Sequence, residues 1–120
     1  MTEQHKDLSQ LIIEGIQERK GRDIVTVDLS AIEGAAANDF IIAQGTSNMQ
    51  VAAIADSIRE YVQDKSGVKP YNYDGYRNAQ WIVIDYGDTI VHIFTPEMRQ
   101  NYNLEELWSD AVITRIPDLD

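Results

Sequence analysis

The sequence contains no cysteine, and its two histidines, His5 and His92, do not form a metal-ligand spacing. Without cysteine, the chain cannot form a disulfide, a zinc–thiolate site, an iron–sulfur cluster or a cysteine nucleophile. A histidine with no second histidine or cysteine at ligand spacing also argues against a metal centre. No serine has an evident base partner for a hydrolase triad. We therefore expect no metal, no cofactor and no catalytic residue.

Long apolar runs are also missing from the 120-residue chain. No stretch approaches the length that a membrane span needs. The opening residues, MTEQHKDLSQ, carry acids before any apolar run, so we expect neither a signal peptide nor a transit sequence. The sequence predicts a cytoplasmic protein with one domain over residues 1–112. Residues 113–120 are predicted to form a loose tail, because Pro117 and terminal acids disfavour regular structure.

Basic residues are scarce, with 10 Lys and Arg against 20 Asp and Glu, for a formal net charge of −10. Such a charge repels phosphate backbones and argues against direct, non-specific nucleic-acid binding. It would attract a basic protein partner. The alternative is that the acidity only keeps the protein soluble.

Helical periodicity predicts two main helices. The first ends at the Arg19-Lys20 pair with Gly21 as its C-cap, and the second begins at a capping box of Ser47 with Gln50 and stops at Gly67. The apolar stripes are Leu8, Leu11, Ile12, Gly15 and Ile16 in the first helix, and Val51, Ile54, Ala55, Ile58 and Val62 in the second.

Shorter elements complete the pattern. Alternation predicts strands at Ile24–Leu29 and Phe40–Ala43 and an extended segment at Lys69–Tyr73. Thr95-Pro96-Glu97 is typical of a helix start, and Asn103 with Glu106 spaces a capping box for a turn or two over Leu104–Trp108. We predict an α/β fold: a two-layer sandwich with a mixed sheet of about five strands and helices mainly on one face.

Residues Trp81 to Phe94, WIVIDYGDTIVHIF, predict a β-hairpin with a tight turn at Gly87-Asp88. Such a turn pairs Tyr86 with Thr89 and Trp81 with Phe94, and strand alternation then sorts the side chains onto two faces. The face predicted to be core holds Ile82, Ile84, Tyr86, Thr89, Val91 and Ile93, and the other holds Trp81, Val83, Asp85, Ile90, His92 and Phe94.

The second face of this hairpin, which carries Trp81 and Phe94, is the strongest signal outside the core. Exposed aromatic side chains clustered with apolar ones mark association surfaces. The alternative is that the C-terminal segment around Trp108 covers this face. His92 is either a contact residue there or an ordinary histidine on a sheet surface.

Two further groups could carry chemistry. Gly45-Thr46-Ser47, between a strand and a helix, is either an anion site or a structural cap. Asp85 and Asp88 are either Mg²⁺ ligands or turn and contact residues. Together they leave open a Mg²⁺-dependent, nucleotidyltransferase-like enzyme, and a generic dimeric adaptor is the third hypothesis.

Four motifs in order resemble the ribosomal silencing factor family, also called Iojap-like. They are GTSN (Gly45 to Asn48), V-x-x-IAD (Val51 to Asp56), W-x-V-x-DYGD-x-x-VH-x-F (Trp81 to Phe94) and R-x-x-YNLEELW (Arg99 to Trp108). The resemblance covers nearly the whole chain.

The resemblance implies a non-catalytic translational repressor with a fold related to nucleotidyltransferases but without their complete active site. Such a protein binds the large ribosomal subunit through its ribosomal protein numbered fourteen and blocks joining of the small subunit when nutrients are scarce. Homodimerisation is also implied. Trp81 carries over as the contact tryptophan. Strand parity adds Val83, Asp85, Ile90, His92 and Phe94, and Asp88 joins them as a turn and contact residue.

Overall fold

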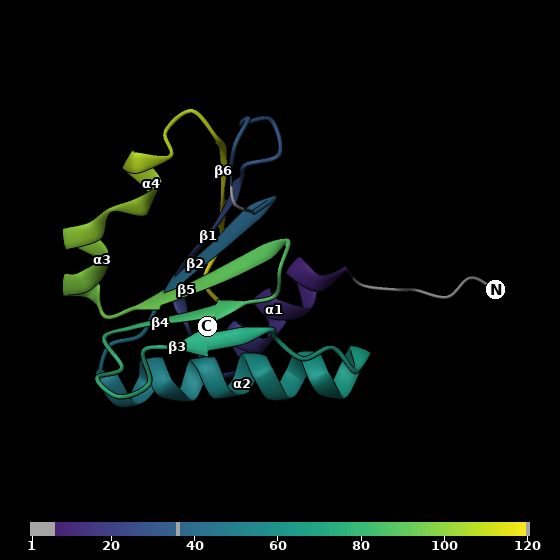
Figure 1. Cartoon of the computed structure of the whole chain (residues 1–120). Coiled ribbons are helices and arrows are strands. Elements are labelled where there is room, and N and C mark those ends of the chain that lie inside the picture. Colours follow the sequence, from purple (N-terminus) through teal and green to yellow (C-terminus); the bar gives the residue numbers. More distant parts are fainter. Residues whose placement is uncertain (1–6, 36, 120) are drawn as a thin grey trace.

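The structure, a computed structural model, describes residues 7–35 and 37–119, which form one mixed sheet with helices on both sides (Figure 1). The elements are α1 (Leu8–Glu18), β1 (Arg22–Asp28), β2 (Asp39–Gln44), α2 (Asn48–Ser66), β3 (Asn72–Asp74), β4 (Trp81–Asp85), β5 (Thr89–Phe94), α3 (Pro96–Tyr102), α4 (Leu104–Leu107) and β6 (Val112–Ile116). The two long helices, α1 and α2, cover one face, and α3 and α4 lie on the opposite side. The predicted α/β class is confirmed.

The sheet has the strand order β3-β4-β5-β2-β1-β6. β2 and β5 run parallel, from Asp39 opposite Thr89 to Gln44 opposite Phe94, and every other pair is antiparallel. A parallel pair needs a long crossover connection, which here includes α2. The mixed sheet predicted from the strand–helix passage and the hairpin is therefore present.

The segment predicted to be a loose tail instead supplies the sixth strand. β6 pairs antiparallel with β1, with Ile113 opposite Val27 and Ile116 opposite Ile24. Beyond the strand, Asp118 Oδ1 accepts a hydrogen bond from the Asp23 N–H at 2.9 Å. The tail prediction was wrong because residues 112–116 pair with the free edge of β1, which is distant in the sequence.

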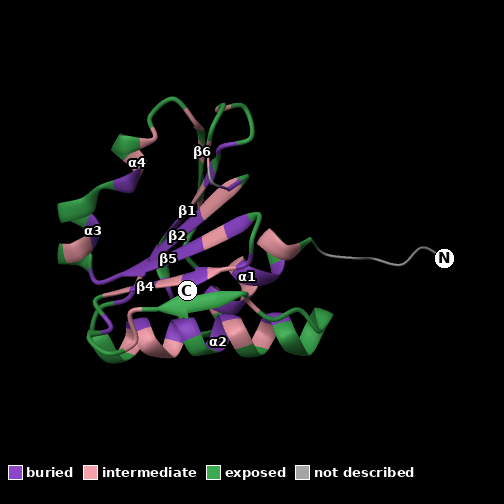
Figure 2. Ribbon diagram, in the orientation of Figure 1, coloured by how far each residue is buried: buried purple, intermediate pink, exposed green. Residues whose placement is uncertain are grey.

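The main core lies between the sheet and the α1–α2 layer, where Figure 2 shows buried stretches on both helices and on the strands above them. Both predicted apolar stripes point into it, except that Leu8 is only half-buried. Gly15 allows the two helices to approach closely, because a Cβ there would lie 2.9 Å from the Ile58 Cα. The helices fold as amphipathic elements that bury one side.

The end of α1 differs from the prediction. Gly21 is not the C-cap: Arg19 occupies that position, and Lys20 adopts the left-handed conformation with φ 58°. The Gly21 N–H donates to the Ile16 carbonyl at 3.0 Å, as in a Schellman motif. Glycine is needed at position 21 for space, because a Cβ would lie 2.3 Å from Ile16 Cγ2.

The predicted helix starts after the hairpin are present, with one difference in capping. The Thr95 side chain accepts from the Met98 N–H at the start of α3, as expected. Asn103 instead ends α3 in the left-handed conformation, with φ 44°, and its side chain makes no cap bond to the backbone of α4. Its side-chain amide donates to Glu106 Oε1 at 3.0 Å, and its backbone carbonyl accepts from the Glu106 N–H at 3.1 Å.

Among the helices of the described residues, none is both long and apolar enough to cross a membrane.

Candidate functional site

The hairpin forms as predicted. Trp81 lies opposite Phe94, and the Tyr86 N–H donates to the Thr89 carbonyl at 2.9 Å across the turn. Gly87 supplies the positive φ, 93°, that the tight turn requires. The Asp85 carboxylate accepts from the Gly87 N–H at 2.7 Å, which makes Asp85 a turn-stabilising residue.

The two faces of the hairpin separate as strand alternation predicts. The core face is buried against α1 and α2, including Tyr86 and Thr89. On the other face, Trp81, Val83, Asp85 and Ile90 are half-buried. His92 is only 7% exposed and Phe94 is 0% exposed. The second face is thus partly covered by the chain itself, and the coverage is greatest at the α3 end of β5.

The C-terminal segment provides this cover, as one of the two alternatives proposed. Leu104 of α4 packs with Phe94 in a second apolar cluster, and the Trp108 ring meets Phe40 edge-on with centroids 6.0 Å apart. Tyr102 of α3 lies against Trp81, with centroids 4.5 Å apart. The cover is incomplete, because Trp81 remains half-buried and Tyr102 is 50% exposed.

Trp81 is held on three sides. Its ring stacks on Phe94 at 5.1 Å and contacts Tyr102, and its indole Nε1 donates to His92 Nδ1 at 3.1 Å. Burial lowers the pKa of His92 to about 4, so the imidazole is neutral near pH 7. Stacked and edge-on aromatic contacts of this kind favour defined ring orientations. The surface of this face is therefore a fixed aromatic ring with aliphatic neighbours.

Sequence reasoning missed one exposed neighbour of this face and one exposed apolar side chain on α4. Tyr102 contacts Trp81 directly, and Leu107 of α4 is an exposed apolar side chain, 69% accessible. Both lie within the R-x-x-YNLEELW motif, whose apolar and aromatic positions were the available signal. We call the set Trp81, Val83, Ile90 and Tyr102 the aromatic face.

Arg99 begins the R-x-x-YNLEELW motif, but sequence reasoning assigned it no role. It is 9% exposed and connects four elements through its guanidinium. Nη1 donates to the Asp23 carbonyl at 2.6 Å and to Gln44 Oε1 at 3.3 Å, and Nη2 pairs with Glu105 Oε2 at 2.9 Å. Arg99 therefore fixes α3 and α4 against β1 and β2, and with them the cover over the aromatic face.

The Gly45-Thr46-Ser47 turn satisfies its own donors. Ser47 Oγ accepts from the Gln50 N–H at 3.1 Å, which confirms the N-cap. Gln50 Oε1 accepts from the Thr46 N–H at 2.6 Å, one residue earlier than a standard capping box. These internal bonds use two amides that an anion would need, so the turn is a structural cap.

Asp85 and Asp88 do not converge on a metal site. The Asp85 carboxylate caps the turn, and the Asp88 carbonyl accepts from the N–H groups of Asn38 and Asp39 at 2.8 and 3.2 Å. Within residues 7–35 and 37–119 there is no group of three or more His, Cys, Asp or Glu side chains that could hold a metal ion. The arrangement supports the turn interpretation of Asp85, and a contact role for either residue stays a prediction.

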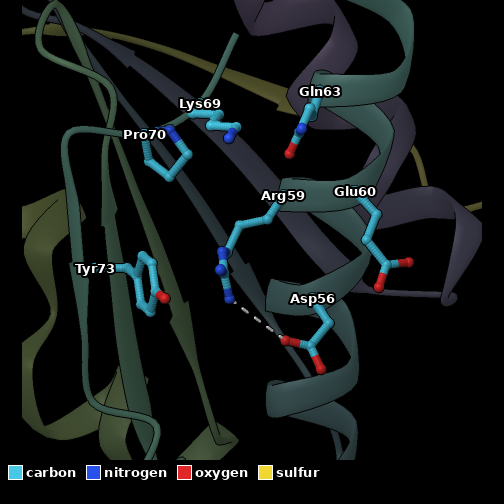
Figure 3. A pocket seen from close by; sticks show the side chains of 7 residues that line it. All are labelled: Asp56, Arg59, Glu60, Gln63, Lys69, Pro70 and Tyr73. Carbon is cyan, nitrogen blue, oxygen red and sulfur yellow. Dashed lines mark ion pairs between the residues drawn. The ribbon is translucent and has the colours of Figure 1, made fainter. Parts of the chain in front are cut away.

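A separate hollow of about 380 Å³ lies between α2 and β3 (Figure 3). The Arg59 guanidinium sits 3.8 Å from the centroid of the Tyr73 ring, 3.3 Å from the Tyr76 hydroxyl and 3.8 Å from the Asp56 carboxylate. Burial raises the pKa of Tyr76 to about 12, so its hydroxyl stays protonated and donates to Asp56 at 2.9 Å. These contacts hold β3 against α2, while the buried Arg59 Nε has no hydrogen-bond partner among the described residues.

The fold and the site define a small α/β protein with a partly covered aromatic face and no assembled catalytic centre among the described residues. The family model described as "Ribosomal silencing factor during starvation" matches residues 2–120. The chain belongs to the ribosomal silencing factor family, a family of non-enzymatic ribosome regulators.

Relatives of similar length support this placement. The Ribosomal silencing factor RsfS of Bacillus subtilis is 34% identical over 115 residues, 96% of this chain and 93% of the relative. The protein of the same name from Halalkalibacterium halodurans is 36% identical over 107 residues, 89% and 90% of the two chains. A crystal structure of a Chromobacterium violaceum protein superposes with a TM-score of 0.79 at 34% identity and covers 85% of this chain and 83% of that one.

Proposed function

We propose that this protein is a translational repressor of the cytoplasm. It binds the large ribosomal subunit through the ribosomal protein numbered fourteen, sterically blocks association with the small subunit and so lowers translation under nutrient limitation. The observation that carries the proposal is a fixed, partly exposed tryptophan on a sheet face of a chain from this family. The action requires no cofactor, metal or catalytic residue, because occupying the surface is sufficient.

Charge favours a basic protein as the direct partner. The chain carries a net charge of −10, and the acids Asp85, Asp88 and Glu106 lie on the hairpin turn and on α4. Arg99 of α3 is buried and paired with Glu105, whereas the exposed Arg77 lines a hollow beside Trp81. Opposite charge accelerates encounter and excludes wrong partners, while apolar burial supplies most of the affinity.

The residues divide into contacts and supports. Trp81, Val83 and Ile90 supply apolar contact, Asp85 and Asp88 supply charge at the turn, and Tyr102 extends the surface. His92 and Phe94, predicted as contacts, lie behind Trp81 and act through it, since the chain already buries both. A central aromatic anchor with a polar rim is the usual arrangement of a protein-binding hot spot.

The same face can also receive a second copy of this chain. Half-buried aromatic and aliphatic side chains offer an apolar patch of the kind that homodimers use. Self-association and ribosome binding then compete. Sedimentation equilibrium of wild type and Trp81→Ala tests this proposal, because loss of the anchor should shift a dimer toward monomer. An oligomeric state that does not change would place any dimer contact elsewhere.

Co-sedimentation with isolated large ribosomal subunits tests the proposed function. We expect the protein to pellet with the large subunit, and the binding to weaken as salt rises, because charges steer the encounter. Val68→Ala is the matched control: it removes an exposed apolar side chain beyond the end of α2, outside the aromatic face, and should bind as wild type. Protein that stays in the supernatant would overturn the proposal.

A further inference from the structure

His92 and Trp81 are in contact but do not lie directly opposite each other in the strand register. Trp81 lies opposite Phe94, and His92 lies opposite Val83, so the indole reaches diagonally across the hairpin to the imidazole. The bond from Trp81 Nε1 to His92 Nδ1 measures 3.1 Å. Diagonal contacts on an antiparallel pair are within reach of long aromatic side chains.

The direction of the bond fixes the protonation of His92. An indole N–H only donates, so Nδ1 must accept with its lone pair, and the neutral ring then carries its proton on Nε2. Nε2 is buried, and it has no hydrogen-bond partner among the described residues. A buried, unpartnered N–H is unfavourable, and an apolar side chain at position 92 would avoid it. What a histidine provides there is the acceptor for Trp81.

Ring contacts alone leave the indole a choice of orientation. Phe94 and Tyr102 hold it by ring contacts at 5.1 and 4.5 Å, and such contacts are compatible with more than one rotation of a ring. A single hydrogen bond at Nε1 selects one of them. His92 is itself packed between Phe40, with centroids 4.8 Å apart, and Phe94 at 6.1 Å, so rings on two sides hold the acceptor in place.

We propose that His92 is a positioning residue for binding: by accepting the Trp81 indole N–H, it holds the partly exposed tryptophan in the one orientation that meets the partner. The proposal rests on the proposed function and names the residue behind its anchor. Side chains that are ordered before binding lose less entropy when the complex forms. His92 therefore contributes to affinity without touching the partner.

Two substitutions separate the acceptor from the shape of the ring. His92→Asn keeps an acceptor, because the Asn Oδ1 can take the place of Nδ1, whereas His92→Leu removes it and keeps the site apolar. The ¹H–¹⁵N resonance of the Trp81 indole, distinguished from that of Trp108 with a Trp108→Phe variant, reports the hydrogen bond in the free protein. We expect it to keep its downfield position and slow exchange with water in His92→Asn and to lose both in His92→Leu.

Binding to the large subunit is then measured for the same variants. We expect His92→Leu to bind about three- to tenfold more weakly, the fold-change of one side chain that must be ordered on binding. His92→Asn should bind within about twofold of wild type. Normal binding by His92→Leu despite a lost indole hydrogen bond would overturn the inference, and so would weak binding by His92→Asn with the bond intact.

Trp81 variants distinguish failure of the His92 inference from failure of the proposed binding surface. Trp81→Phe removes the indole donor together with part of the ring, so the effect of His92→Leu is measured within that background, where it should be absent; an additive loss would show that His92 acts otherwise. If His92→Leu folds poorly, His92→Asn still tests the inference, because weak binding by this variant with the indole hydrogen bond intact would overturn it. Trp81→Ala that binds as wild type would instead refute the proposed surface, whatever His92 does.

Discussion

Trp81 and Phe94 lie opposite each other at the open end of the hairpin with their rings stacked 5.1 Å apart, yet only Trp81 reaches the surface. The register makes the two positions equivalent. The difference arises because Leu104 and the segment around it pack against Phe94. One ring is therefore a core residue and its neighbour is a candidate contact, and the two should respond differently to truncation.

Truncation of Phe94 should mainly affect stability. Phe94→Ala removes a ring that is 0% exposed, and large-to-small changes at such sites cost about 3–5 kcal/mol of the free energy of unfolding. Urea denaturation followed by far-UV circular dichroism measures the loss. Trp81→Ala, at a half-buried position, should cost less. A Phe94→Ala protein with the midpoint of wild type would contradict the burial of this ring.

Arg99 should be far more important for stability than an exposed arginine. Arg99→Met leaves Glu105 without its partner and two carbonyl acceptors unfilled, and breaking a buried pair costs about 3–5 kcal/mol. Arg22→Met is the matched control, because its pair with Asp118 is exposed and should contribute only about 0–1 kcal/mol. Chemical denaturation compares the two, and equal losses would argue against the role of Arg99.

Substitutions of two adjacent residues at the end of α1 should change stability in opposite directions. Gly21→Ala places a methyl group against Ile16 and should destabilise the fold by about 1–3 kcal/mol. Lys20→Gly relieves a left-handed residue with φ 58° and should stabilise it by about 1 kcal/mol. Thermal unfolding of both variants measures the signs. Stabilisation by Gly21→Ala would show that this end of α1 is not tightly packed.

The stability of the protein should fall as the pH drops from about 7 to about 4 because of His92. Burial lowers the folded-state pKa from 6.5 to about 4, so the unfolded chain binds the proton first. The stabilisation that comes from keeping His92 neutral is fully present above the unfolded-state pKa and is lost as the pH falls toward the folded-state pKa. The loss in the free energy of unfolding has a limit of about 3 kcal/mol.

Unfolding free energies of wild type and His92→Asn, measured across this range, isolate the effect of the histidine. The advantage of wild type over the variant should shrink toward low pH, because only wild type carries the buried imidazole. A difference that does not change with pH would contradict the burial of a neutral His92.

Local patterns predicted most of the fold for a physical reason. Helix stripes, caps and the Gly87-Asp88 turn depend on residues within a few positions of one another, so the printed sequence contains the whole cause. β6 could not be predicted this way, because its formation depends on the free edge of β1, far away in the sequence. The reason for glycine at position 21 could not be predicted either, because it lies in the packing of the Ile16 side chain, which leaves no space for a Cβ.

The candidate site was also predictable only in part. Alternation along the hairpin correctly placed Trp81 and its neighbours on one face, because parity does not depend on tertiary structure. It could not tell which of those side chains the chain itself covers, since α3 and α4 determine the burial of Phe94 and His92. Arg99 was missed because its partners, Asp23 and Gln44, are remote in the sequence.

Subunit joining is the most direct measurement of the central claim. Purified large subunits are incubated with wild-type protein or Trp81→Ala, small subunits are added, and light scattering or a sucrose gradient follows the formation of whole ribosomes. The account predicts that wild type blocks joining and that Trp81→Ala, still folded, loses large-subunit affinity by more than about 1 kcal/mol and blocks joining only at higher concentration. Joining that proceeds normally with saturating wild-type protein, or a Trp81→Ala variant that blocks it as well as wild type, would contradict the account.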